Sequence, residues 1–133
     1  ELEKERISEI ERSEIGYWYP NTPFDQSWEM WRGVHRDHGI TDISKFYTKR
    51  NLRAIASWWN EAENVNDKRL GSAIRFLITS TYRRSSIMTT WNILRLVQAS
   101  MSGTLYIPSL MVENNLLDLL DSKAKQIFAG FST

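Results

Sequence analysis

The sequence predicts a mainly α-helical domain with one or two short β-strands near residues 91–107. Apolar residues recur at helical spacing in three runs, which follow Thr48, Asp67 and Asn114. Each of these residues can cap a helix start by accepting a hydrogen bond from an unpaired backbone amide. The composition, 41% hydrophobic and 25% charged over 133 residues, is that of one globular domain.

We therefore expect an exposed helical arm over residues 1–14 and one compact helical domain over residues 15–133. The arm holds six acidic and three basic side chains, and its apolar stripe of Leu2, Ile7 and Ile10 is thin. Such an arm suits packing on a neighbouring domain, or self-association with a second copy of the chain. Gly16 is expected to end it.

Composition excludes several classes of protein. The chain has no Cys, so disulfide frameworks and thiolate metal sites are excluded. No apolar run approaches the roughly 20 residues that cross a bilayer, and no signal-peptide pattern opens the chain. We expect a cytoplasmic protein with no membrane partner. Because the sequence starts without Met at a charged helical segment, we also expect it to be part of a longer protein.

Residues 17–36 are rich in aromatic rings, and Pro20 and Pro23 exclude a continuous helix there. The rings can anchor a long loop to the helices, because leaving so many of them in water is costly. Alternatively, Trp18, Tyr19 and Trp28 can form a stacking platform for extruded or single-stranded bases, since such platforms combine rings with cations.

Thr48 is the predicted N-cap of the first long helix. Its apolar stripe comprises Leu52, Ile55, Ala56 and Trp59. The cations Lys49, Arg50 and Arg53 lie in its first turns, where the helix dipole also favours anions. They are candidate DNA-binding residues. For Arg50 the equal alternative is a structural ion pair, for instance with Asp42.

Asp67 is predicted to cap a second helix that runs to about Tyr82. Its clean apolar face predicts that it is the central helix of the core; this face comprises Leu70, Ala73, Ile74, Leu77, Ile78 and Thr81. Arg83, Arg84 and Ser85 follow as a second candidate DNA-binding patch, because Arg suits bidentate contacts with phosphate and guanine. Residues 32–95 hold twelve basic and five acidic side chains, which either form a basic face or simply decorate exposed helices.

Residues 87–102 fit two interpretations. Alternation of Trp91, Ile93 and Val97 on one face fits a strand, whereas Ile93, Leu94, Val97 and Met101 share one side of a helix. The segment 104–107 has a β-favouring composition and predicts a short strand before Pro108. A last helix is predicted to begin at Glu113 or Asn114.

Five short elements give the chain a family resemblance. They are Trp18-Tyr19-Pro20, His38-Gly39-Ile40, Phe46 to Leu52, Gly103 to Ser109 and Glu113 to Leu116. In this order they resemble a recurrent segment of bacterial and archaeal DNA methyltransferases that methylate the exocyclic amino groups of adenine or cytosine. The resemblance spans roughly residues 15–130 and implies a role in DNA methylation or restriction-modification.

The resemblance also implies two catalytic features that this sequence lacks. One is a glycine-rich turn for the cofactor, and the other is a D/N/S-P-P-aromatic segment that grips the target amino group. The segment Tyr106-Ile107-Pro108-Ser109 is not a version of the latter. No catalytic residue is therefore predicted, and S-adenosylmethionine is expected to bind the parent enzyme outside these residues. His35 and His38 lack the helical spacing of a zinc pair, so no metal site is predicted.

The expected function is a non-catalytic accessory or target-recognition domain that contributes to DNA binding. The alternative is a structural domain that docks on the catalytic domain of the same polypeptide, or on a partner subunit.

Overall fold

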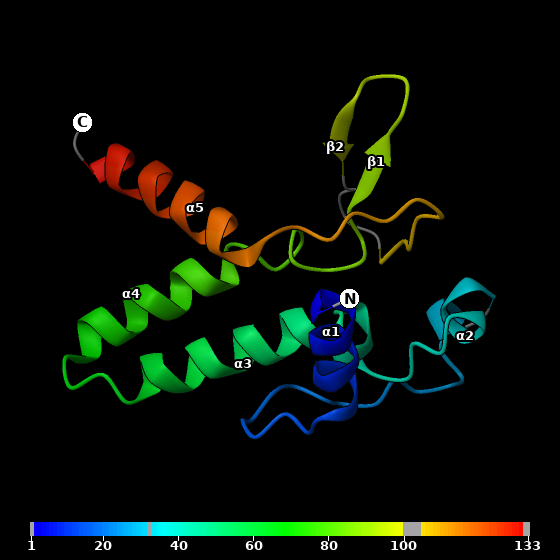
Figure 1. The fold of residues 1–133 in the computed structure, drawn as a ribbon, viewed down its shortest axis with the longest axis horizontal. Helices are drawn as coiled ribbons and strands as arrows, with labels where there is room; N and C mark the ends of the chain where they lie inside the picture. The colour runs from blue at the N-terminus through cyan, green and yellow to red at the C-terminus, as the bar shows by residue number, and fades with distance from the viewer. Residues whose placement is uncertain (1, 32, 100–104, 132–133) are drawn as a thin grey trace.

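Helices α3 (Lys49–Glu63) and α4 (Lys68–Thr79) lie side by side and form the body of the fold, with α5 (Leu116–Phe131) beside α4 (Figure 1). The structure is a computed structural model that describes residues 2–31, 33–99 and 105–131. Over these residues the remaining elements are α1 (Leu2–Arg12), η1 (Glu29–Trp31), α2 (Val34–Asp37), η2 (Ile43–Phe46), β1 (Thr90–Asn92) and β2 (Val97–Ala99). The predicted class, mainly α with short strands, is confirmed.

Side-chain caps define the starts of the three long helices. Thr48 Oγ1 accepts a hydrogen bond from Asn51 N at 3.3 Å, and Asp67 Oδ1 accepts from Arg69 N at 2.8 Å, so both predicted caps are confirmed. The last helix begins later than predicted. Asn115 Oδ1 accepts from Leu117 N at 3.0 Å, and Asn115 therefore takes the capping role expected of Glu113 or Asn114.

The principal core cluster lies beside the N-terminal end of α3. Ile40, Phe46 and Ile107 are buried together, and the rings of Phe24 and Tyr47 pack against them with Ile87 and Met88. The prediction that the second long helix is central to the core is wrong. On α4 only Gly71 and Ile78 are buried, Leu70 and Phe76 are exposed, and the helix ends at Thr79 rather than near Tyr82.

The segment 87–102 forms a β-hairpin as far as it is described. Strands β1 and β2 pair antiparallel, with Trp91 opposite Gln98, and the turn between them has Leu96 at a φ of 52°. The base of the hairpin is held by residues 110–112, because Val112 N donates to the carbonyl of Thr89 at 2.9 Å. Residues 105–107 form no strand, contrary to prediction; Met101 and Thr104 lie outside the described residues.

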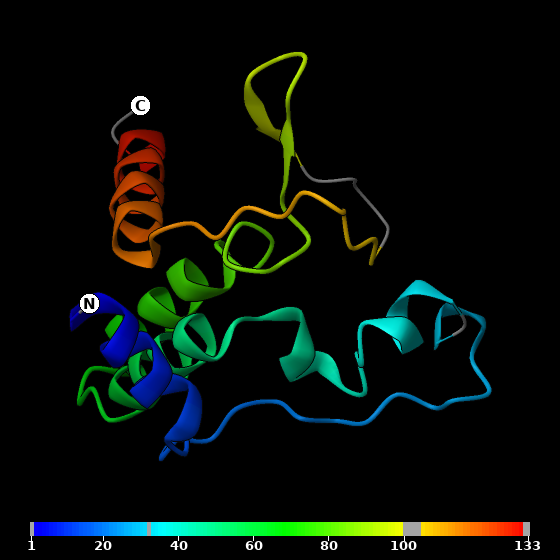
Figure 2. The same cartoon turned by 45° about the vertical axis from the view of Figure 1, so that its right-hand side comes forward.

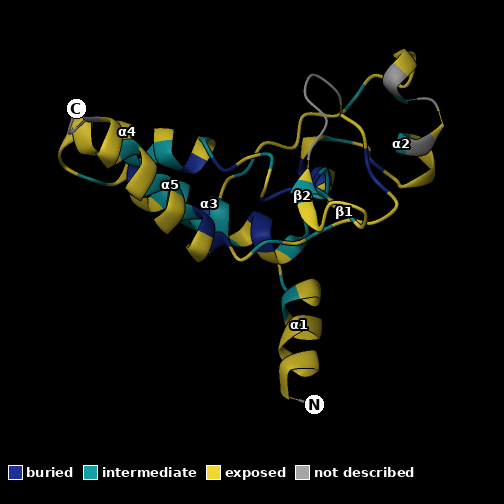
Figure 3. Cartoon of the chain, turned by 90° about the horizontal axis from the view of Figure 1, so that it is seen from above, coloured by how far each residue is buried: buried dark blue, intermediate teal, exposed yellow. Residues whose placement is uncertain are grey.

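Three parts of the chain extend from the body. Helix α1 projects away from it and has no buried residue (Figure 3). It ends at Arg12, before the predicted Gly16. A long loop leads from α1 to the region of α2, and the hairpin stands clear of the helices (Figure 2). The accessible surface is 9840 Å². A compact monomer of 15.6 kDa exposes about 7,300 Å², so this chain carries a large excess of exposed surface.

The contact between α3 and α4 predicts a specific sensitivity at Gly71. A Cβ atom at this position would lie 2.6 Å from the backbone oxygen of Ala62 on α3. Gly71→Ala is therefore expected to lower the free energy of unfolding by about 1–3 kcal/mol, as overpacking does, even though Ala favours helix. Urea unfolding followed by circular dichroism measures this. Gly16→Ala, where a Cβ meets nothing within 4 Å, is the matched control; equal stability of both variants would contradict the close approach.

Candidate nucleic-acid interface

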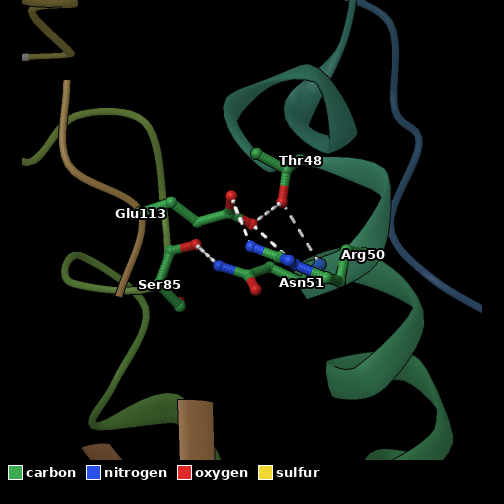
Figure 4. A network of polar contacts seen from close by, with 5 residues as sticks. All are labelled: Thr48, Arg50, Asn51, Ser85 and Glu113. Carbon is green, nitrogen blue, oxygen red and sulfur yellow. Dashed lines mark hydrogen bonds and ion pairs between the residues drawn. The ribbon is translucent and has the colours of Figure 1, made fainter. Parts of the chain in front are cut away.

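The start of α3 is joined to the C-terminal segment through a single carboxylate, that of Glu113 (Figure 4). Arg50 Nη2 lies 2.8 Å from Glu113 Oε2, and Arg50 Nε donates to Glu113 Oε1 at 3.3 Å. Thr48 Oγ1 donates to the same Oε1 at 2.5 Å. Arg50 therefore forms the structural ion pair that was the alternative to DNA binding, but with Glu113 in place of Asp42.

Asn51 extends this junction to a third segment of the chain. Its side chain is buried, and its Nδ2 donates to the carbonyl of Ser85 at 3.0 Å (Figure 4). Nearby, Asn114 Nδ2 donates to the carbonyl of Arg84 at 2.8 Å. We name this set of contacts the α3 junction: Thr48, Arg50, Asn51, Ser85, Arg84, Glu113 and Asn114. It binds the start of α3, the turn after α4 and the lead into α5 to one another.

The second predicted DNA-binding patch is divided by this arrangement. Ser85 is 2% exposed, and its Oγ donates to the carbonyls of Thr81 and Tyr82 at 3.0 and 3.1 Å. Its hydroxyl is therefore committed to the interior and does not join a surface patch. Arg84 is exposed, whereas Arg83 is half-buried and its carbonyl accepts from Thr89 Oγ1 at 2.9 Å.

Lys49 and Arg53 hold the C-terminal end of α1. Lys49 Nζ donates to the carbonyl of Glu11 at 2.7 Å, and Arg53 Nη1 donates to Ser13 Oγ at 2.8 Å. Cations at the C-terminal end of a helix meet its unpaired carbonyls and the negative end of its dipole. The three predicted cations of α3 thus have two different environments: Arg50 contacts a carboxylate, and Lys49 and Arg53 contact neutral oxygens.

An apolar pocket of about 260 Å³ lies on the opposite side of α3. None of the described residues that line it is charged. Five of its lining residues are aromatic: Trp18, Tyr19, Tyr47, Trp59 and Tyr82. Burial raises the pKa of Tyr47, and the neighbouring Tyr82 raises it further, so the phenol stays neutral near pH 7. The pocket suits a flat, uncharged group such as a nucleobase or an apolar side chain.

The loop that begins at Tyr17 spans both sides of α3. Tyr17 lines a groove with Arg50 and Arg53, while Trp18 and Tyr19 line the apolar pocket. Trp18 is 70% exposed, so its ring is available for stacking. Trp28, the third predicted stacking residue, lies elsewhere: its ring centroid is 6.4 Å from that of Phe24. The structure brings together Trp18 and Tyr19 but not Trp28.

His35 has a structural environment, whereas His38 is exposed. His35 Nε2 donates to the carbonyl of Leu105 at 2.7 Å, and its ring meets Phe46 edge-on with centroids 6.1 Å apart. Among the described residues, no group of three or more His, Cys, Asp or Glu side chains is placed to hold a metal ion. No helix in the described part of the chain is long and apolar enough to cross a bilayer.

The described parts of the five elements of the resemblance lie around α3, and the first of them lines the apolar pocket. Ile40 and Phe46, from the second and third elements, are buried against Ile107 of the fourth, and Arg50 pairs with Glu113 of the fifth. Sequence reasoning missed this pairing, because no local pattern links residues 63 positions apart. In the sequence, only the order of the motifs in the family resemblance relates the segment of Arg50 to that of Glu113.

Comparison with models of protein families, with curated proteins and with solved structures finds no match to this chain.

The α3 junction predicts that Asn51 is important for stability. Asn51→Ala removes the donor to the buried carbonyl of Ser85, and leaving such a group unsatisfied costs about 1–3 kcal/mol. Urea unfolding should show a lower midpoint with an unchanged slope. Asn60→Ala, on a half-exposed position of the same helix, is the control. If Asn60→Ala destabilised the protein as much as Asn51→Ala, the contact with Ser85 would not be important for stability.

Proposed function

We propose that these residues form a non-catalytic accessory domain of an S-adenosylmethionine-dependent DNA amino-methyltransferase, and that the domain contributes to DNA binding. The family resemblance supplies the enzyme class. The cofactor and the methyl-transfer centre belong to the parent enzyme, and we assign none of their residues here. The parent's catalytic domain and DNA are the proposed partners.

One observation carries the DNA-binding part of this proposal: the loop at Tyr17–Tyr19 lies across α3 and brings aromatic rings close to the cations of that helix. Tyr17 lines a groove with Arg50 and Arg53. The next residue in the chain, the exposed Trp18, lines the uncharged pocket. Proteins that bind unpaired bases combine positively charged grooves for the phosphates with rings for the bases. Trp18 and Tyr19 are the proposed stacking residues, and Lys49 and Arg53 the proposed phosphate contacts.

Arg50 takes a different role in this proposal. Its guanidinium is held by Glu113 at 2.8 Å, so it fixes the start of the helix that presents the other two cations. The pair is half-exposed and contributes about 0–1 kcal/mol by itself. The carbonyl of Arg84 belongs to the junction, and its exposed side chain is proposed to extend the cationic surface.

Fluorescence anisotropy with a labelled duplex and a matched single strand, at 50–200 mM salt, tests the proposal. Binding should weaken with salt, because phosphate contacts release counterions. Trp18→Ala should weaken binding of the single strand roughly tenfold, since one stacked base contributes about 1–3 kcal/mol. The double substitution Lys49→Gln and Arg53→Gln should weaken the binding of both ligands and make that binding less dependent on salt concentration.

Two controls sharpen this experiment. Trp28→Ala removes an exposed ring of the same loop that does not line the pocket. Lys68→Gln removes an exposed cation at the first residue of α4, which follows the C-terminal end of α3 rather than its start. Salt-insensitive binding, or equal losses for Trp18→Ala and Trp28→Ala, would contradict the proposal.

A second candidate, a docking domain, is favoured by the excess exposed surface. The tip of the hairpin presents Leu94 at 95% exposure and Leu96 at 69%, and its strands are only three residues each. Residues 110–112 hold the base of the hairpin, but the described sheet has only two strands, and a two-stranded hairpin is marginal in water, so contact with the catalytic domain would stabilise its tip. Hydrogen exchange in the parent enzyme tests this: hairpin amides no better protected than in the isolated domain would contradict docking.

A further inference from the structure

Helix α1 meets the body through its second half: its hydrogen bonds to α3 lie at its C-terminal end, and Ile7 and Ile10 line a small hollow with Thr48, Arg50 and Glu113. It has no buried residue, and Ile7 is 41% exposed. Its hydrogen bonds to α3 come from Lys49 to the carbonyl of Glu11 and from Arg53 to Ser13 Oγ, at 2.7 and 2.8 Å. The two cations assigned above to phosphate contacts are therefore the two that hold the arm.

We propose that α1 is a displaceable arm that competes with nucleic-acid phosphate for Lys49 and Arg53. This inference rests on the proposed function. The arm offers these cations a carbonyl and a hydroxyl oxygen at the negative end of a helix dipole. A phosphate offers them charged oxygens, which add an attraction between opposite charges that a neutral carbonyl or hydroxyl oxygen lacks. An arriving strand therefore replaces weaker acceptors with stronger ones.

The charges of the arm strengthen this competition. Glu9 lines the same groove as Tyr17, Arg50 and Arg53, so the docked arm puts a carboxylate where a phosphate would lie. The arm as a whole is acidic, with six acids and three bases over residues 1–14. A docked arm thus lowers the positive potential of the surface, and a released arm leaves two cations to be neutralised by the strand.

Arg50 is not part of this exchange. Its partner Glu113 belongs to the lead into α5 rather than to the arm, so displacement of α1 removes neither member of this ion pair, although it uncovers the hollow that Ile7 and Ile10 line beside it. The arm can consequently move without unfolding the body, because no core residue comes from α1. The device changes the strength of DNA binding and leaves the fold unchanged.

Proline substitution separates the arm from the body. Ile10→Pro breaks the turn that carries Glu11 and Ser13, since a proline inside a helix removes a hydrogen bond and clashes with the preceding turn. Glu3→Pro lies in the first turn, where proline is tolerated, and is the matched control. By anisotropy with a duplex, Ile10→Pro should bind at least threefold more tightly than the original chain. Because Lys49 and Arg53 contact phosphate in both complexes, the salt slope of Ile10→Pro should match that of the original chain, and the loss of competition should change the affinity alone.

A second measurement follows the arm directly in the intact chain. Because the protein has no Cys, Ser8→Cys on the arm and Glu61→Cys on α3 allow paired spin labels at two exposed positions. Double electron–electron resonance should give one distribution of distances between the two labels without DNA, and a longer or broader distribution at a saturating concentration of duplex.

The outcomes distinguish this inference from the proposed function. If the original chain binds DNA, while Ile10→Pro binds equally and the label distances stay fixed, the arm does not compete and only this inference fails. If neither chain binds duplex or single strand at any salt concentration, the proposed function fails and the inference fails with it.

Discussion

The α3 junction is the constraint on which the rest of the structure depends. Two side chains connect the start of α3 to distant segments. The buried amide of Asn51 binds Ser85, 34 positions further along the chain, and the carboxylate of Glu113 binds Arg50 across 63 positions. The apolar cluster of Ile40, Phe46 and Ile107 lies immediately before the same helix start. Because the buried apolar core is small, directional contacts at this point carry much of the specification of the fold.

This arrangement explains why the start of α3 combines structural and accessible cations. A helix start offers free amides and a positive dipole end, which favour carboxylates and phosphates alike. Here Glu113 forms an ion pair with Arg50, and acceptors at the end of α1 receive hydrogen bonds from Lys49 and Arg53. The aromatic loop then runs across the helix and closes the uncharged pocket on its other side. The proposed DNA-binding surface is thus built on a helix whose start is held by long-range contacts.

Local signals predicted the parts of the structure that local interactions determine. Thr48 and Asp67 were identifiable as caps because each contacts an amide only two or three residues away. The hairpin was ambiguous, because three-residue strands are too short for periodicity to separate them from a helix. The role of α4 was predicted wrongly, since an apolar stripe shows that a face can be buried but not that anything covers it. Ser85 and Glu113 depend on long-range partners, which no spacing in the sequence reveals.

Native-state hydrogen exchange tests the central role of the junction most directly. Three amides report on the three segments: Leu52 N bonds to Thr48 O, Ile87 N to Phe46 O, and Val112 N to Thr89 O. If the junction makes these segments one cooperative unit, all three amides should open with the free energy of global unfolding, while Ser13 N at the end of α1 opens more easily. Exchange of Ile87 or Val112 through an opening several kcal/mol below that of Leu52 would show that the segments unfold independently, and would contradict this account.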